Sequence, residues 1–248
     1  MKGKRALITG SSSGIGAGVA VALAEAGARI VINYPDPTQH ANAQAVLDKI
    51  EKLGGVATAI QADVALEDDV KRLVDGAVEE MGGIDILVNN AGIAATSPVE
   101  EVPLETWDRI IAVHLRGTFM MTKRVLPMMY AQDYGKIINT ASQLAYIGSP
   151  GLTHYTAAKG AIVSFTRSVA LEIGERNVNI NSVAPGATMT PILDPLPAEL
   201  LEAVRQNIPK GRIASVDDIV PTYLFLASDA ARHYQGQTLS PNGGDAFL

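Results

Sequence analysis

Short apolar runs alternate with longer amphipathic stretches along the whole chain. The apolar runs, rich in Val, Ile and Leu, predict strands at residues 4–9, 29–33, 56–61, 84–89, 136–140, 178–184 and 237–240. The stretches between them predict a helix that follows the glycines of residues 10–16 and ends at 26, and helices at 39–53, 67–81, 105–130, 155–174 and 216–228. Strands with so few polar positions are typical of a parallel sheet covered on both faces. The pattern predicts an α/β fold, a Rossmann-like doubly wound parallel sheet of about seven strands with helices on both faces.

No linker, charge block, repeat or low-complexity segment divides the 248 residues. We therefore expect a single domain, residues 1–248, that is long enough to bury a sizeable core. A Pro-rich excursion between residues 185 and 212 separates the sixth predicted strand from the last predicted helix.

The composition narrows the class of protein. The chain has no Cys, which excludes disulfides, catalytic thiols and thiolate metal sites, and no metal site is predicted. A net charge of −6 without a basic stripe argues against nucleic-acid binding. No run approaches 18 apolar residues, and the apolar run behind the basic N-terminus, residues 6–8, is too short for a signal peptide. We expect a cytoplasmic protein that does not bind a membrane.

A glycine-rich turn follows the first predicted strand and opens the first predicted helix. Its three glycines are Gly10, Gly14 and Gly16. In this context Gly10 permits a tight turn, and the other two let the backbone approach a pyrophosphate at the positive end of the helix. The alternative is a tight turn that needs glycine for conformational reasons alone. The complete pattern favours a dinucleotide site.

Tyr155 and Lys159 lie four residues apart, so on a helix their side chains project from one face. Lowering the pKa of a tyrosine from ~10 to ~7 takes about 4 kcal/mol. One charge at ~4 Å supplies about that much at the effective dielectric of a protein cleft. The lysine therefore makes the tyrosine a candidate general acid and base. The alternative is an exposed amphipathic pair at a spacing that occurs by chance.

Four motifs occur together and in order. They are Thr9-Gly-x-x-x-Gly-Ile-Gly16, Asn89-Asn-Ala-Gly92, Ser142, and Tyr155-x-x-x-Lys159. In these motifs the chain resembles the short-chain dehydrogenase/reductase family, in its branch of about 250 residues. The resemblance covers the whole chain, including Pro185-Gly186 and Gly243-Gly244. It implies an NAD(P)-dependent oxidoreductase that transfers a hydride between nicotinamide and a secondary alcohol or ketone.

The resemblance also implies a role for each matching residue. Ser142 would stabilise the substrate oxygen, Tyr155 would transfer the proton, and Lys159 would hold the ribose and lower the pKa of the tyrosine. The residues predicted to bind the cofactor are Gly10, Ser12, Ser13, Gly14, Ile15, Gly16, Tyr34, Asp36, Asp63, Val64, Asn89, Ala91, Gly92, Tyr155, Lys159, Pro185, Gly186, Thr188 and Thr190.

One catalytic position departs from the family. Where the family usually has an Asn that serves a proton relay, this chain has His114 in the sequence Val-His-Leu-Arg-Gly. A histidine could carry the relay itself, because it donates and accepts and its unperturbed pKa is near 6.5. The alternative is a helix histidine that packs and bonds to a carbonyl.

The segment after the second strand selects between NAD and NADP. It carries Asp36 between two prolines, two residues beyond the usual acidic position. Asp36 could accept from the ribose hydroxyls, or it could serve only as a turn residue. NADP-preferring relatives often place a base here or in the glycine loop, where this chain has Pro35 and Ser13. NAD is therefore predicted in preference to NADP.

The predicted substrate pocket is walled by residues 94–97 and 143–152, by His154, and by a lid at about 188–212. Gln143, Tyr146 and His154 could bond a polar substrate, but for each of them taken singly a loop or helix-cap role is favoured.

Residues 127–134 contain no base, although relatives that act on carrier-bound thioesters tend to have bases there to hold an acidic partner. This favours a free small substrate such as a sugar, polyol or simple ketone. A 3-oxoacyl thioester reductase is the first alternative, and a non-catalytic dinucleotide-binding protein is the second. The helices near 105–130 and 155–173 are apolar on more than one side, so a homotetramer is expected.

Overall fold

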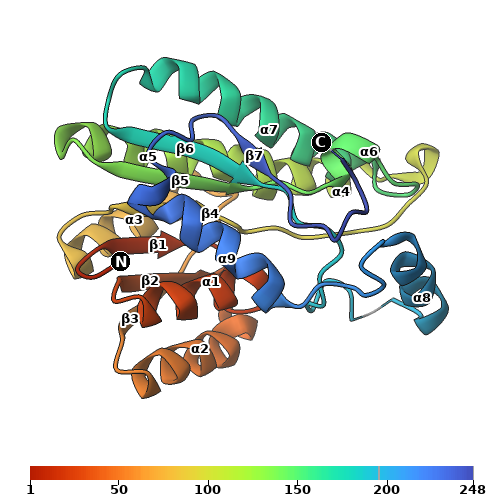
Figure 1. The fold of residues 1–248 in the computed structure, drawn as a ribbon, viewed down its shortest axis with the longest axis horizontal. Coiled ribbons are helices and arrows are strands. Elements are labelled where there is room, and N and C mark those ends of the chain that lie inside the picture. Colours follow the sequence, from red (N-terminus) through yellow and green to blue (C-terminus); the bar gives the residue numbers. More distant parts are fainter. Residues whose placement is uncertain (195, 248) are drawn as a thin grey trace.

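The computed structural model describes residues 1–194 and 196–247. Within them, a parallel sheet of seven strands has the order β3-β2-β1-β4-β5-β6-β7 (Figure 1). The strands are β1 (Arg5–Ile8), β2 (Arg29–Tyr34), β3 (Val56–Gln61), β4 (Ile86–Asn89), β5 (Gly135–Thr140), β6 (Val178–Val183) and β7 (Thr238–Leu239). The predicted Rossmann-like architecture is confirmed.

Helices cover both faces of the sheet, and each face has its own apolar core (Figure 1). One face carries α1 (Gly14–Glu25), α2 (His40–Lys52) and α9 (Val216–Ala227), and the other carries α3 (Glu67–Met81), α5 (Gly117–Ala131) and α7 (Thr153–Ile173). Alternate strand residues serve the two cores: in β1, Ile8 faces the first and Leu7 faces the second. No helix in the described ranges is long and apolar enough to cross a membrane.

The packing of α1 on α9 depends on a glycine. A Cβ atom built on Gly18 would lie 2.3 Å from Val216 Cγ1 and 3.1 Å from Val220 Cγ2. The absence of a side chain at this position therefore sets how closely the two helices approach.

The long helix predicted at residues 105–130 is interrupted. It comprises α4 (Leu104–Ile111), a π-helical turn, η3 (Ala112–Arg116), and α5. The turn lies where two tight contacts form: the His114 ring packs on Gly92, and Gly117 packs on Val64. A π turn adds one residue to the helix and is frequent at functional sites. His114 lies within this π turn.

Shorter elements complete the fold. They are η1 (Pro37–Gln39), which directly precedes α2, and η2 (Val99–Glu101), α6 (Leu144–Ile147), α8 (Ala198–Asn207) and η4 (Asp229–Ala231). The sequence did not predict α6, which is four residues long, or α8, which lies in the Pro-rich excursion.

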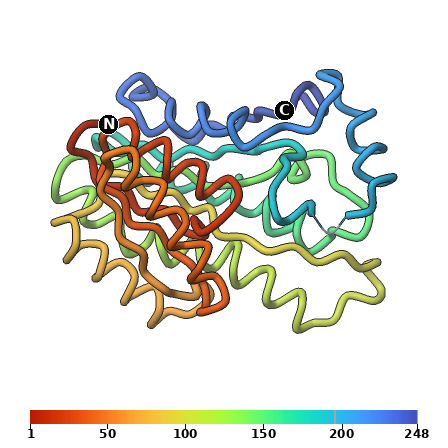
Figure 2. Tube along the Cα trace, turned by 90° about the horizontal axis from the view of Figure 1, so that it is seen from below, coloured from red at the N-terminus to blue at the C-terminus, as the bar shows by residue number. Residues whose placement is uncertain are grey.

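The strand order reverses between β2-β1 and β4, so a crevice is expected at the carboxyl ends of β1 and β4. Figure 2 shows that the loops after β4 and β5 and the excursion with α8 gather at one end of the molecule, away from the N-terminus. Residue 195 of the predicted lid lies outside the described residues. These segments surround the end of the sheet where the predicted site residues lie.

Candidate active site

The glycine loop is joined to the neighbouring strands by hydrogen bonds. Gly10, with φ of +59°, donates its N–H to Asn33 Oδ1 (3.1 Å), and its carbonyl accepts from Asn90 Nδ2 (2.9 Å). Thr9 Oγ1 accepts from the N–H groups of Asn90 and Ala91 (3.0 and 3.1 Å). The carboxyl ends of β1, β2 and β4 are thereby held together around the loop.

The N-terminus of α1 has no side-chain cap in the described part of the chain. Its N-cap residue, Ser13, makes no side-chain capping bond, although such a bond normally satisfies one of the first N–H groups of a helix. A Cβ atom on Gly16 would lie 2.4 Å from the carbonyl oxygen of Gly10, so the turn is as tight as glycine allows. Gly14 has a φ of +56°, and a Cβ atom built on it would lie 3.5 Å from the side chain of Thr190 in the excursion. Free N–H groups at a helix N-terminus fit the diphosphate of a dinucleotide.

Ser142, Tyr155 and Lys159 converge at the carboxyl end of β5. Ser142 lies two residues beyond the strand and accepts a hydrogen bond from the N–H of Leu144 (3.2 Å). Lys159, on α7 with the tyrosine, donates from Nζ to the carbonyl oxygen of Thr140 (2.6 Å). The ammonium lies 5.5 Å from the centroid of the Tyr155 ring. The lysine therefore anchors α7 to the strand beside the serine.

Burial dominates the electrostatics of this group. It lowers the pKa of Lys159 from 10.5 to about 7. Burial also raises the pKa of Tyr155 above its ordinary value, and a side-chain hydrogen bond with Ser142 opposes that shift. In the protein by itself the tyrosine is therefore held in its neutral form, which is the form that can donate a proton to a substrate oxygen.

His114 is buried and is held by the backbone of the loop after β4. Its Nε2 lies 3.0 Å from the N–H nitrogen and 2.8 Å from the carbonyl oxygen of Ile93, so it bonds to one or the other according to its tautomer. Its ring packs edge-on against Tyr155, with centroids 5.4 Å apart. Burial and the nearby Lys159 lower the pKa of His114 to about 3. The histidine is therefore neutral at physiological pH, packed, and bonded to the backbone.

The two predicted cofactor carboxylates both have partners within the protein. Asp36 accepts from the N–H of Thr38 (2.8 Å) and caps η1. Asp63 accepts from the N–H of Ala65 (3.0 Å) and forms an ion pair with Arg109 (2.8 Å). The turn role weighed for Asp36 is thus the one its contacts fit.

Other predicted cofactor residues line the same end of the sheet. Asn89 is buried and donates to Thr122 Oγ1 (3.1 Å) and Asn139 Oδ1 (2.9 Å), which makes it a cross-link between β4, α5 and β5. Thr188 is buried and donates to the carbonyl oxygen of Gly186 (2.9 Å). Tyr34 is buried, and its hydroxyl lies 3.1 Å from His40 Nδ1. Predicted residues that are buried or half-buried near the loop ends are Ser12, Ile15, Val64, Ala91, Gly92 and Pro185.

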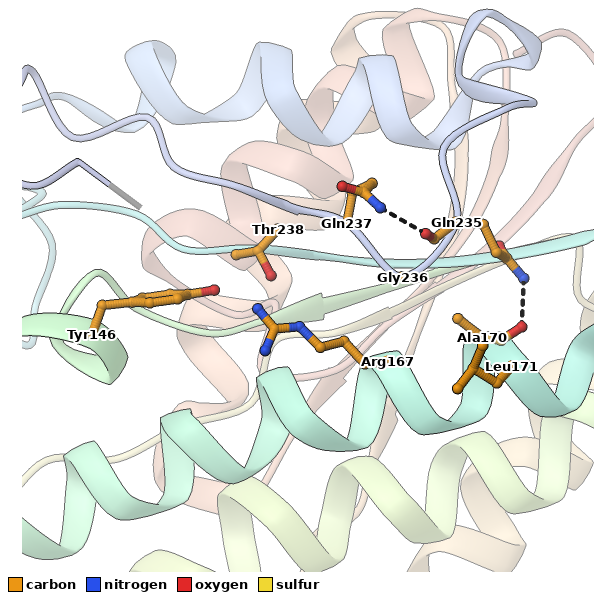
Figure 3. A pocket seen from close by; sticks show the side chains of 8 residues that line it. All are labelled: Tyr146, Arg167, Ala170, Leu171, Gln235, Gly236, Gln237 and Thr238. Atoms are coloured by element: carbon orange, nitrogen blue, oxygen red, sulfur yellow. Dashed lines mark hydrogen bonds between the residues drawn. The ribbon is translucent and has the colours of Figure 1, made fainter.

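Two of the three polar candidates for the substrate wall point elsewhere. His154 is fully buried, so it cannot contact a substrate in this conformation. Tyr146 extends toward Arg167 and Thr238, over a surface hollow of about 500 Å³ between α6, α7 and β7 (Figure 3). The third candidate, Gln143, is buried, and its amide donates to Asp245.

Three polar residues that hold the site together were not predicted. Asn33 and Asn90 tie the glycine loop to β2 and β4, and Asp245 reaches Gln143 from the C-terminal segment. Asn90 belongs to the Asn-Asn-Ala-Gly motif, so the sequence could have indicated it. Nothing in the sequence indicates Asp245, because its partner, Gln143, lies 102 positions away. Within residues 1–194 and 196–247, no three His, Asp or Glu side chains are arranged to hold a metal ion.

Comparison with known proteins identifies the class. A family model described as enoyl-(acyl carrier protein) reductase matches residues 10–245. The chain is 39% identical over 241 residues to the 3-oxoacyl-[acyl-carrier-protein] reductase FabG of Staphylococcus aureus, with 97% of each protein covered. It is 40% identical over 240 residues to the 3-oxoacyl-[acyl-carrier-protein] reductase of Synechocystis, with 96% of this chain and 95% of that protein covered.

Solved structures agree. A short-chain type dehydrogenase/reductase from Mycobacterium marinum superposes with a TM-score of 0.94 at 35% identity, covering 100% of this chain and 97% of the other. Levodione reductase superposes with a TM-score of 0.92 at 33% identity, covering 98% of both. The protein is a nicotinamide-dependent oxidoreductase that acts on CH–OH groups. The chain belongs to the short-chain dehydrogenase/reductase family.

Proposed function

We propose that this enzyme interconverts a 3-oxoacyl thioester and the corresponding 3-hydroxyacyl thioester. The observation that carries the proposal is the likeness, at 39–40% identity over nearly the whole chain, to two proteins named as 3-oxoacyl-[acyl-carrier-protein] reductases. These relatives support the thioester alternative better than the free small substrate expected from the sequence. The convergence of Ser142, Tyr155 and Lys159 supports catalysis over mere dinucleotide binding.

The three residues divide the chemistry of carbonyl reduction. When bound, the reduced nicotinamide supplies the hydride. Tyr155, neutral because burial raises its pKa, donates its hydroxyl proton to the substrate oxygen. The Ser142 hydroxyl donates a hydrogen bond to the same oxygen and stabilises the charge that develops there. Lys159, fixed on the Thr140 carbonyl oxygen, stabilises the tyrosinate that remains.

The cofactor would be held by the segments described above. The N–H groups at the start of α1 suit its diphosphate, Lys159 suits the ribose hydroxyls, and Thr188 and Thr190 lie on the loop after β6. We favour NAD over NADP, because neither the glycine loop nor residues 30–48 contain Lys or Arg to pair with a 2′-phosphate. A kcat/KM for NADPH above that for NADH would contradict this preference.

The excursion at about 188–212 is proposed to act as a substrate lid in a single-domain enzyme. It carries α8 at the open end of the sheet, and its Thr190 lies where a side chain on Gly14 of the glycine loop would reach it. A lid of this kind excludes water once a ligand is bound. A cytoplasmic location is proposed because a chain without Cys suits a reducing compartment.

A free small ketone is the second candidate substrate. It is favoured by residues 127–134, which lack any base to hold an acidic carrier and include Asp133. A carrier-independent thioester, such as a coenzyme A derivative, is also compatible with this observation.

An absorbance assay at the reduced-nicotinamide band separates the candidates. The panel consists of acetoacetyl thioesters of coenzyme A, N-acetylcysteamine and acyl carrier protein, together with cyclic ketones, sugars and polyols. We expect at least one thioester to give the highest kcat/KM, and Tyr155→Phe to lose turnover while still binding cofactor. Higher kcat/KM for a free ketone than for every thioester would reject the thioester proposal. Turnover that survives in Tyr155→Phe would reject the proton-transfer role.

A further inference from the structure

The C-terminal segment contacts the loop that carries Ser142. Gln143 Nε2 donates a hydrogen bond to the Asp245 carboxylate, and 102 positions separate the two residues. Gln143 is only 4% exposed, so the contact is shielded from bulk water on its amide side. A hydrogen bond to a charged acceptor in such surroundings is among the stronger ones in a protein.

Asp245 is presented from a braced turn. Asn242 Nδ2 donates to Ser240 Oγ (3.0 Å) and to the carbonyl oxygen of Ala246 (2.7 Å), and its Oδ1 accepts from the N–H of Gly244 (2.9 Å). These bonds close the segment on itself around Asn242. The carboxylate of Asp245 is therefore held in place by the fold of the turn.

Gln143 is fixed at both its backbone and its side chain. Its N–H donates to the carbonyl oxygen of Pro185 (3.0 Å), while its amide is held by Asp245. Consecutive Cα atoms lie about 3.8 Å apart, so fixing Gln143 restricts where the preceding Ser142 can lie. Displacement of a catalytic group by about 1 Å can cost about 100-fold in rate.

The carboxylate also sets the orientation of the Gln143 amide. A carboxylate only accepts, so the amide NH₂ must face Asp245 and Oε1 must point the other way. Oε1 lies 3.1 Å from where a Cβ atom on Gly186 would stand, and it has no hydrogen-bond partner in the described part of the chain. The amide thus packs against the Pro185-Gly186 segment. Gln143 thereby joins the loop that carries Ser142, the C-terminal turn and the loop after β6.

We propose that Gln143 and Asp245 form a positioning pair for the oxidoreductase reaction. The pair holds the main chain at Ser142 so that the serine hydroxyl meets the substrate oxygen. This inference rests on the role proposed for Ser142 and does not depend on which carbonyl compound is the substrate.

Reversal of the pair tests the proposal. Gln143→Glu sets two carboxylates against each other, and we expect kcat to fall by about 10- to 100-fold. The loss should shrink as the pH is lowered, because two adjacent carboxylates can share a proton. Adding Asp245→Asn exchanges donor and acceptor at unchanged side-chain lengths, and the double variant should recover most of the kcat. The primary isotope effect with C4-deuterated cofactor should rise in Gln143→Glu, while KM and cofactor affinity stay unchanged.

The chain offers a matched control. On the exposed surface of α2, Gln44 Nε2 donates to Asp48 Oδ1 (2.8 Å). Gln44→Glu, Asp48→Asn and their combination make the same chemical changes outside the candidate site. These variants should leave kcat and its pH profile as in the wild type.

Three results would overturn the proposal. They are a wild-type kcat in Gln143→Glu, a double variant no faster than Gln143→Glu, and an effect confined to KM. An effect confined to KM would indicate that the C-terminal turn supports the end of the lid instead, since the N–H of Lys210 donates to the carbonyl oxygen of Gly243. Thermal unfolding checks each variant, and Gln143→Met, with the same expected loss of kcat, replaces Gln143→Glu if that variant is unfolded. Failure of the thioester proposal would be a separate result. The wild-type enzyme would then prefer another ketone, and the kcat of each variant would be compared on that ketone.

Discussion

Burial at the carboxyl end of β5 controls the charges of the catalytic side chains. Lys159 is buried beside a carbonyl oxygen without a carboxylate partner in the described residues, and its pKa falls to about 7. Tyr155 shifts the opposite way, because burial disfavours the anion. Both shifts favour the uncharged forms. The protein therefore holds these residues in an arrangement that a bound cofactor, with its ribose hydroxyls, would stabilise.

Lys159→Met should stabilise the cofactor-free protein while abolishing turnover. The pKa of Lys159 is lowered from 10.5 in the unfolded chain to about 7 in the folded protein, so between these pH values the unfolded state binds more protons and stability rises with pH. The cost of burying the lysine is thus fully present at pH 7 and below and is lost by about pH 10.5. We expect a higher Tm for the variant, by about 5 °C or more at pH 6–7, since 1 kcal/mol is worth about 2–4 °C at this chain length.

Calorimetry across pH 6–10 measures this difference. The gain should shrink steadily above pH 7. A variant that is less stable than wild type at pH 6.5, or a gain that grows with pH, would contradict the assigned shift.

His114→Ala should lower kcat more than it raises KM. The ring packs against Tyr155 and is bonded to the backbone of Ile93, so its loss frees both the tyrosine and the loop after β4. We expect about a 10-fold loss, by analogy with other misplaced catalytic groups. The pH–rate profile between pH 5 and 8 should keep its shape, because the pKa of His114 is about 3 and the group does not titrate there.

His114→Asn serves as the companion variant, since an amide can also bond to the Ile93 backbone. It should retain more activity than His114→Ala. Unchanged turnover in His114→Ala would exclude both a relay and a positioning role. If the pH–rate profile of the wild type shows a titration near pH 6.5 that His114→Ala lacks, the result would support the relay.

At the scale of elements, close approach between helices depends on single glycines. Gly18 lies where α1 crosses α9, and Val216 Cγ1 fills the space that a Cβ atom would need. Alanine normally stabilises a helix interior by about 1 kcal/mol relative to glycine. A 2.3 Å contact with a stiff, β-branched valine reverses the sign of that effect.

Gly18→Ala should therefore destabilise the fold by about 1–3 kcal/mol, as overpacked cores do. Adding Val216→Ala should recover part of the loss by removing the clashing methyl groups. Urea unfolding of both variants measures the effect. A Gly18→Ala protein as stable as wild type would mean that the two helices separate at little cost.

The strands could be predicted closely, because a parallel sheet covered on both faces requires apolar residues along each strand. The π turn at Ala112–Arg116 could not, since it depends on the contacts of His114 with Gly92 and of Gly117 with Val64, which only the folded chain brings together. In the candidate site, Tyr155 and Lys159 could be found from local spacing. The Gln143–Asp245 contact could not, because nothing near either residue in sequence indicates the other.

For the whole molecule, exposed apolar side chains on α5 and α7 make these two helices candidates for self-association. On α5 and α7, Phe119 is 44% exposed and Leu171 is 84% exposed, and Phe119 stacks edge-on with Phe165 at 6.4 Å. Both helices use their other sides for the core beneath the sheet. A surface of this kind commonly marks a contact between proteins. The homotetramer expected from the sequence would cover these side chains with the same helices of a second copy.

Light scattering tests this assembly. Wild-type protein should have about four times the mass of one chain, and Phe119→Glu or Leu171→Glu should give smaller species. Leu53→Glu, at the end of α2 on the opposite face of the sheet and 48% exposed in the wild type, is the control and should not change the mass. A monomeric wild type would reject the proposal, and a tetramer that persists in both glutamate variants would move the interface elsewhere.

The Gln143–Asp245 contact has a consequence for how the protein is made. Translation delivers the glycine loop first and Asp245 more than two hundred residues later. The N-terminal strands and helices can pair while the ribosome is still working, since domains begin to fold during synthesis. The loop at Ser142 must wait for its last hydrogen-bond partner. A nascent chain that stops after β7 would contain Ser142, Tyr155 and Lys159 and would still lack the turn that braces them.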